Sequence, residues 1–208
     1  PPIPEAPTDE QVQTALETIH NVLWDFPFKD AASQAHAYAL ILTPILRPYI
    51  RGHVPFILVD KPQAGTGAGL LTEVAALTAT GRPAALMTAP DDEAEWTKVL
   101  TALLMEGASF VSIDNIEGRL SSAVLAAVIT ALVHRGRVLG RSETVELPLG
   151  NVSWVGTGNN VQLGGDLPRR TVWIRMDSAE ERPWQRTEFR IPRLLDYVQT
   201  NRGQIVAA

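Results

Sequence analysis

The order of apolar and polar residues divides the chain into a helical start and a longer part in which strands and helices alternate. Near the start, apolar residues recur at helical spacing up to Leu23, after a capping box formed by Thr8 and Gln11. Asp30 is placed to cap a second, largely apolar helix, and two prolines in its second half must bend or end it. The pattern therefore predicts an N-terminal helical annex over residues 1–53.

From residue 54 onward, short apolar runs alternate with helical patterns. Strands are predicted at 54–59, 83–88, 110–113, 152–155 and 171–174. Helices are predicted at 70–79, 90–106, 121–134 and 192–200. Two further runs, 137–140 and 144–147, are predicted to form a β-hairpin with Arg141 at its tip. Strands that alternate with helices form parallel sheets covered on both faces. Residues 54–208 are therefore predicted to be an α/β core with a mostly parallel sheet and a C-terminal helix.

The composition is that of an ordinary globular protein, and it narrows the chemistry. Of the 208 residues, 45% are apolar and 20% are charged, and the net charge is −5. The absence of cysteine excludes disulfides and thiolate–metal sites, and the four histidines lack metal-binding spacing. No run of 18 uncharged apolar residues occurs, so we expect no membrane contact and a cytoplasmic location. The start at Pro1, without a methionine, leaves open that the chain is a piece of a longer protein.

Basic residues are concentrated near the end of the chain. Eight of the 18 lysines and arginines lie at or after Arg169. One interpretation is a solvated, salt-bridged helical region, in which single ion pairs contribute little to stability. The alternative is that some of these arginines contact phosphate groups, for which the planar guanidinium is well suited.

A glycine-rich segment, Lys61-Pro-Gln-Ala-Gly-Thr-Gly-Ala-Gly-Leu70, joins the first predicted strand to the following helix. This layout is typical of a phosphate-binding loop, in which backbone N–H groups and a helix N-terminus face an anion. Against the pattern G-x-x-x-x-G-K-[ST], Gly67 matches the second glycine and Pro62 replaces the first. Ala68 stands at the lysine position and Gly69 at the hydroxyl position. The backbone cradle is therefore predicted without its two functional side chains.

Two other strand ends also carry polar residues. Asp114 follows the third predicted strand, and Asn159 and Asn160 follow the fourth, at intervals of about 45 residues along the chain. Ligands of open α/β sheets bind at the carboxyl ends of the strands, so these residues are candidates for one site. Taken singly, each has a structural alternative, namely a tight turn or a helix cap. The ordered series, followed by Pro-Arg169-Arg170, is the stronger signal.

This order of motifs resembles the AAA+ class of P-loop ATPases over about residues 54–200. The chain is most similar to the ATPase domains of replicative or primase-associated proteins of phages and mobile elements, near superfamily 3 helicases. The resemblance implies ATP and Mg2+ as cofactors, single-stranded DNA in a ring pore, a homo-oligomer that is expected to be a hexamer, and a primase domain or partner.

The resemblance also implies roles for individual residues. Residues Gly65, Thr66, Gly67, Ala68, Gly69 and Leu70 correspond to the Walker A loop. Asp114 corresponds to the Walker B carboxylate that holds Mg2+, and Asn159 or Asn160 to the sensor that orients the attacking water. Arg169 or Arg170 corresponds to the arginine finger that reaches a neighbouring subunit, Arg193 to a second sensor, and Arg141 to the DNA contact of the pore hairpin.

The departures from the family pattern bear on catalysis. Asn115 stands where a second acidic residue, the usual base, follows the Walker B aspartate, and Glu117 is the candidate replacement. Lys61 is the candidate replacement for the lysine missing at Ala68. A charged hydrogen bond contributes about 1.5–3 kcal/mol, so its loss lowers nucleotide affinity by about one to two decades. Hydrolysis suffers more, because charge stabilisation is concentrated in the transition state.

Two functional hypotheses follow. The first is an ATP-dependent, ring-forming DNA helicase or translocase module of phage or mobile-element replication. The second is a degenerate module that does not hydrolyse ATP and serves as a nucleotide-binding, structural or DNA-loading scaffold. Ala68 and Gly69 favour the second hypothesis, whereas Asp114, Asn159 and the Arg169–Arg170 pair favour the first. A metabolic P-loop kinase is a third, weaker alternative.

Overall fold

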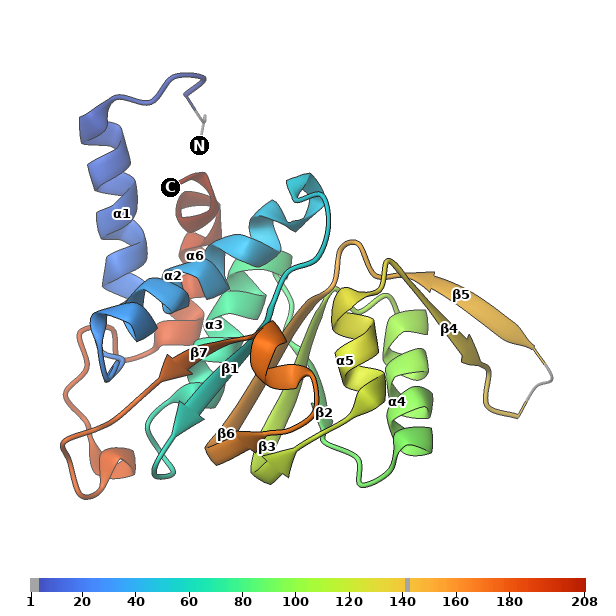
Figure 1. The fold of residues 1–208 in the computed structure, drawn as a ribbon. Helices are drawn as coiled ribbons and strands as arrows, with labels where there is room; N and C mark the ends of the chain where they lie inside the picture. Colours follow the sequence, from blue (N-terminus) through green and yellow to red (C-terminus); the bar gives the residue numbers. More distant parts are fainter. Residues whose placement is uncertain (1–3, 141–142) are drawn as a thin grey trace.

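The computed structural model describes residues 4–140 and 143–208 and contains a five-stranded parallel sheet covered by helices on both faces (Figure 1). The strand order is β2-β3-β6-β1-β7, and every neighbouring pair is parallel. The strands are β1 (Phe56–Lys61), β2 (Ala85–Thr88), β3 (Phe110–Leu120), β6 (Ser153–Leu163) and β7 (Thr171–Arg175). The predicted α/β class with a mostly parallel sheet is confirmed.

Alternating side chains of the strands supply two separate apolar cores. In β1, Ile57 and Val59 belong to a core shared with α1 (Asp9–Leu23), α2 (Ala31–Leu46), α3 (Ala68–Thr80) and α6 (Leu194–Ala207). Phe56 and Leu58 point to the other face and pack with α4 (Glu93–Met105) and α5 (Ala123–Thr130). The unbroken apolar run from Phe56 to Val59 is typical of a strand that is buried on both faces of a sheet.

The two N-terminal helices begin at the residues that the sequence predicts. Thr8 and Gln11 form a reciprocal capping box at the start of α1, with bonds of 2.9 and 3.3 Å. The Asp30 carboxylate accepts a bond of 2.7 Å from the Ser33 N–H at the start of α2. Pro44 lies inside α2, which continues for only one half-turn before a 3-10 turn, η1 (Arg47–Tyr49). Among the described residues, no helix is long and apolar enough to cross a membrane.

Several predicted boundaries in the second half of the chain are wrong. The C-terminal helix, expected to end at residue 200, continues to Ala207. The strands expected to end at residues 113 and 155 continue to Leu120 and Leu163, because β3 and β6 pair with each other along nearly their whole length. The helix expected to run to His134 ends at Thr130, and His134 lies in a strand, β4 (Val133–Arg137). Local periodicity does not report the pairing of distant strands, which decides the ends of β3 and β6.

The predicted β-hairpin is present, but its first strand, expected at 137–140, lies at 133–137 and shares only Arg137 with the prediction. It consists of β4 and β5 (Thr144–Pro148), paired antiparallel, and extends away from the sheet beyond α4 (Figure 1). Arg141 lies outside the described residues. The hairpin is joined to α4 at Thr101, whose hydroxyl lies 2.9 Å from Nε2 of the buried His134. Gly136 allows this approach, because a Cβ atom at that position would lie 2.1 Å from Thr101 Oγ1.

We predict that this junction makes stability depend on pH. Burial lowers the pKa of His134 below its ordinary value of 6.5. At a pH between the ordinary pKa of 6.5 and the lower pKa of His134 in the folded chain, the unfolded chain binds a proton that the folded chain excludes. The free energy of unfolding therefore falls as the pH falls through this range. The slope is limited to about 1.4 kcal/mol per pH unit for one group. Urea unfolding of wild type and His134→Asn at about pH 7.5 and about pH 5.5 measures it. An identical pH dependence in both proteins would contradict the prediction.

Candidate functional site

The register of the central strands brings polar side chains together at the carboxyl edge of the sheet. Lys61, the last residue of β1, is paired with Asn159 of β6. Val59 and Val155 face the core that contains α3, so Lys61, Thr157 and Asn159 point to the same face of the sheet. The Thr157 hydroxyl donates a hydrogen bond to the Asp114 carboxylate, which places Asp114 on this face as well. The sequence-predicted residues Lys61, Asp114 and Asn159 therefore form one cluster.

A β-bulge positions Asp114. Ile113 is paired with Gly156 and Ile116 with Gly158, so the two residues between them on β3 face the single residue Thr157 on β6. Asn115 takes a left-handed conformation there, with φ +54°, and its N–H donates to Thr157 Oγ1 at 3.3 Å. Buried Thr157 thus holds both bulge residues. Sequence reasoning missed Thr157, whose only local signal is its position between two glycines.

The charged and amide groups of the cluster restrain one another. Lys61 is half-buried, and burial lowers its pKa, although the Asp114 and Asp60 carboxylates act in the opposite direction. Asp60 is itself fixed, because its carboxylate accepts the Val161 N–H at 2.9 Å. The Oδ1 atom of Asn159 is buried and has no partner within the described part of the chain. The cluster therefore contains a carboxylate, a cation and an unused acceptor at the end of β1.

Two other predicted residues lie beside this cluster. Glu117 is exposed, is paired with Asn159 across the sheet, and accepts a bond of 3.2 Å from the Asn115 amide. Asn160 adopts φ +50° and donates from its amide to the Pro62 carbonyl at 3.3 Å, so it supports the start of the glycine loop. Glu117 is therefore open to solvent at the site, whereas Asn160 has a structural contact.

The glycine loop leads from β1 into α3 with the geometry of an anion cradle. Gly65 and Gly67 have φ values of +81° and +92°, which side-chain-bearing residues rarely adopt. The helix α3 begins at Ala68 without a side-chain cap, and its first internal bond runs from the Leu71 N–H to the Gly67 carbonyl at 2.9 Å. The earlier N–H groups of the helix are left for another partner at its positive end.

Three residues of the loop, Thr66, Ala68 and Gly69, differ in their surroundings. Thr66 is only 4% exposed, and its Oγ1 has no hydrogen-bond partner among the described residues. Ala68 is 1% exposed and packs in the core, so the position of the missing lysine is occupied by a small apolar residue. A Cβ atom on Gly69 would meet no atom within 4 Å, so the backbone there is open to close approach. Residues 62–70 therefore offer backbone N–H groups and the Thr66 hydroxyl to a ligand, and they contain no lysine or arginine.

A cavity of about 480 Å³ lies against the loop. Its walls come from the loop, the end of α1, the segment between β7 and α6, and the first turn of α6, and they include Gly65, Thr66, Gly67, Leu70, Phe26, Arg186 and Arg193. Arg193, predicted to face the nucleotide, therefore lies at this cavity, but its side chain is 85% exposed and is paired with Asp196 at 2.5 Å. This size suits a small organic ligand.

The segment between β7 and α6, residues 177–193, crosses the glycine loop and is called the strap below. A Cβ atom on Gly65 would lie 2.9 Å from Trp184 Cβ and 3.1 Å from the Trp184 nitrogen, so the strap packs directly on the loop. The Gln63 amide donates to the carbonyls of Ser178 and Glu180 at 3.4 and 3.1 Å. The strap is thus attached to the loop at two points.

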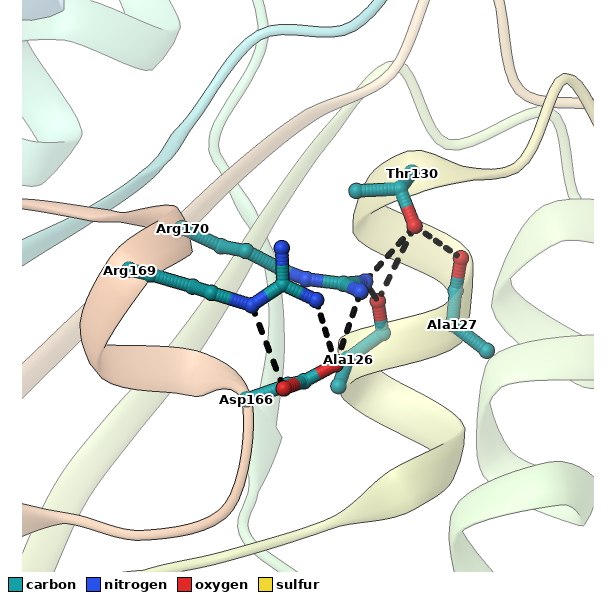
Figure 2. A network of polar contacts seen from close by, with 6 residues as sticks. All are labelled: Ala126, Ala127, Thr130, Asp166, Arg169 and Arg170. Carbon is teal, nitrogen blue, oxygen red and sulfur yellow. Dashed lines mark hydrogen bonds and ion pairs between the residues drawn. The ribbon is translucent and has the colours of Figure 1, made fainter.

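The Arg169–Arg170 pair lies at the opposite edge of the sheet. Both residues belong to a 3-10 turn, η2 (Leu167–Arg170), and the next residue, Thr171, is paired with Phe56 at the start of β1. Figure 2 shows Asp166 bound to both guanidinium groups, at 2.8 Å to Arg169 and 2.9 Å to Arg170. Neither arginine therefore reaches the glycine loop of its own chain.

Arg170 also fastens η2 to α5. Its guanidinium donates to the Ala126 carbonyl and to the Thr130 hydroxyl, the latter at 2.7 Å (Figure 2). The side chain of Arg169 remains largely exposed, at 67%. Of the two, Arg169 is therefore the one whose side chain is accessible to another molecule, and it is already paired with Asp166.

Within the described residues, no group of three histidine or acidic side chains is arranged to hold a metal ion. Asp114, the predicted Mg2+ ligand, accepts a hydrogen bond from Thr157 and lies near the Lys61 cation.

Comparison with known proteins shows the fold. No protein-family model matches the sequence, and no curated protein matches it significantly. Among solved structures, the apo C-terminal region of NrS-1 is similar with a TM-score of 0.62 and 16% identity, covering 92% of this chain and 44% of that one. The JCV helicase with a bound thiazolopyridine compound gives a TM-score of 0.52 and 11% identity, covering 96% and 58%. The chain thus spans about half the length of these structures.

These similarities, together with the sheet order and the loop that follows β1, show an α/β fold like that of P-loop NTPases, and one of the similar structures is a helicase. At these levels of identity the similarity concerns the fold alone.

We predict that Gly65 and Gly69 respond oppositely to alanine, although both belong to the glycine loop motif. Gly65→Ala combines a positive φ with contacts of 2.9–3.3 Å to Trp184, and we expect it to destabilise the protein by about 1–3 kcal/mol. Gly69→Ala meets no atom within 4 Å and lies in a helix, so a gain of up to about 1 kcal/mol is expected. Urea unfolding measures both. Wild-type stability of Gly65→Ala would show that the strap does not pack on the loop.

Proposed function

We propose that this chain binds ATP at the glycine loop and is the ATPase module of a ring-forming DNA helicase or translocase. The observation that carries the proposal is the combination of an uncapped helix N-terminus with the buried, unpartnered hydroxyl of Thr66 at a cavity of nucleotide size. A buried hydroxyl without a partner costs free energy that a bound phosphate would return. The helicase-like fold supports the wider assignment.

The residues present fit a nucleoside triphosphate. The N–H groups at the start of α3, the Thr66 hydroxyl and the open backbone at Gly69 suit the phosphate groups, which bind at helix N-termini. The apolar residues of the cavity, including Phe26 and Leu194, suit the base and sugar. Mg2+ would be held by Asp114 together with phosphate oxygens and water, and it would neutralise charge on the phosphates.

The hydrolysing form of this function uses the cluster at the end of β1. Lys61 would donate to the phosphates in place of a lysine at position 68, because it precedes the loop and shares a sheet face with Asp114. Asn159, with its unused Oδ1, would orient the attacking water, and exposed Glu117 would accept its proton. These groups are already held by the sheet, which lowers the reorganisation needed for catalysis.

The proposed contacts with a neighbouring subunit and with DNA use surfaces away from the loop. Arg169, with Arg170 behind it, would act on the nucleotide of a neighbouring subunit, since its own loop lies at the other edge of the sheet. The hairpin of β4 and β5 carries Arg135 and Arg137, and we propose that it contacts single-stranded DNA in the pore of a hexamer. The proposal includes a primase domain or partner outside this chain.

A second candidate is the module that binds nucleotide without hydrolysing it. The buried Ala68 and the side-chain-free Gly69 favour this reading. The lysine that reaches the β- and γ-phosphates and the hydroxyl that binds Mg2+ in the family pattern are both absent. Such a module would retain the fold and serve as a scaffold or DNA-loading part of the ring.

ATP hydrolysis with Mg2+, with and without single-stranded DNA, separates the two candidates. For the motor, we expect DNA-stimulated turnover that Asp114→Ala lowers by about 100-fold or more, since it removes the proposed Mg2+ ligand. For the scaffold, we expect ATP binding without turnover. Absence of ATP binding at millimolar concentration would contradict both.

Replacement of Lys61 tests its role directly. We expect Lys61→Ala to lower ATP affinity by about 10- to 100-fold, the effect of losing one charged hydrogen bond, and to lower turnover further. Lys98→Ala is the matched control, because Lys98 is an exposed lysine on α4 paired with Glu95 at 2.5 Å. Titration calorimetry with ATP measures the affinity of both variants. Equal ATP affinities of Lys61→Ala and Lys98→Ala would show that Lys61 does not contact the nucleotide.

A further inference from the structure

The strap brings an arginine to the cavity of the glycine loop. Trp184 of the strap packs on Gly65, and Arg186, shortly after it, lines the same cavity as Gly65, Thr66 and Gly67. Its guanidinium comes from a segment that follows the last strand, whereas the loop follows the first. A cation from a segment distant in the sequence therefore lines the same cavity as the glycine loop.

Arg186 is held in place before any ligand binds. Its Nη1 donates to the Asp25 carbonyl at 2.9 Å and its Nη2 to the Asp25 carboxylate at 2.5 Å. The guanidinium also lies over the ring of Phe189, 4.8 Å from the centroid. Its side chain is 31% exposed, and the residue lines the cavity. These contacts use two of the five N–H donors of the guanidinium and leave others for a ligand.

The other cations near the loop are placed less favourably for this role. Arg193 lines the cavity, but it is 85% exposed and forms a surface ion pair, an arrangement that contributes little and costs side-chain entropy to fix. Lys61 lies at the sheet edge near Asp60 and Asp114 and is not part of the cavity wall. Arg186 alone among the three is both part of the wall and restrained.

We propose that Arg186 binds the phosphate groups of the nucleotide and supplies, from the strap, the cation that Ala68 does not provide. Guanidinium groups bind phosphate through two parallel N–H bonds, so a restrained arginine is well suited to this task. Asp25 is the positioning residue, since it fixes the guanidinium and also accepts the Arg190 N–H at 2.7 Å, which anchors the strap. This inference rests on the proposed nucleotide site.

The binding of ATP, ADP and adenosine to three proteins tests the inference. Arg186→Gln removes the charge and keeps an amide for the Asp25 carbonyl. Arg190→Gln is the matched control, because Arg190 belongs to the same strap but lies over Trp24, 4.7 Å from its centroid, and is not part of the cavity wall. Titration calorimetry in the presence of Mg2+ measures each affinity, and thermal unfolding checks that each variant is folded.

We expect Arg186→Gln to weaken ATP binding by about 10- to 100-fold, ADP binding by less, and adenosine binding hardly at all, because only phosphate contacts are lost. Arg190→Gln should retain wild-type affinity for all three ligands. Arg186→Lys keeps the charge and should recover part of the ATP affinity, and it provides the same test if the glutamine variant does not fold.

Two results would overturn the inference while leaving the nucleotide site intact. Wild-type ATP affinity in Arg186→Gln would exclude a phosphate contact. Equal losses for ATP and adenosine would show that Arg186 only supports the wall of the cavity. Failure of the wild-type protein to bind ATP would overturn the proposed function itself, and the inference with it.

Discussion

The parallel pairing of β1 with β6 is the constraint on which the site depends. It sets Lys61 opposite Asn159 and gives their side chains the same face as Thr157. A shift of one residue would turn all of these side chains to the other face, because the period of a strand is two. The same pairing places the start of the glycine loop beside the polar cluster, where the Asn160 amide donates to the Pro62 carbonyl. The apolar residues of β1, buried on both faces, hold this register.

The site retains features that a structure selected for stability alone would lose. Asn115 and Asn160 have positive φ values, and the buried Thr66 Oγ1 and Asn159 Oδ1 lack partners among the described residues. Strained backbone and unsatisfied buried groups cost about 1–3 kcal/mol each and cluster at functional sites. These four residues lie in the loop and within β3 and β6. Three other buried atoms without a partner among the described residues belong to Arg47, Ser153 and Arg170, away from the loop. A bound phosphate would satisfy the hydroxyl, which couples ligand binding to the stability of this edge of the sheet.

The absent Walker lysine changes how charge is distributed around the loop. The start of α3 is anchored by a buried Ala68, so the helix N-terminus contributes only its backbone dipole. Full positive charges come from two other elements, with Lys61 on the sheet side and Arg186 on the strap side, and each has a carboxylate nearby. Nucleotide binding would then draw together the sheet, the loop and the strap. A nucleotide that contacts both Lys61 and Arg186 would thus join two segments of the chain that are distant in the sequence.

The sequence by itself determined the local elements of this protein. The caps at Thr8 and Asp30, the glycine loop and the order of strands and helices depend on neighbouring residues, and the structure contains them. Only the tertiary structure decided the rest. The length of β3 and β6 and the bulge at Asp114 depend on their mutual pairing, and the contact of Asp25 with Arg186 joins residues 161 positions apart. Such pairings leave no periodic signal, because they are selected by the packing of the whole sheet.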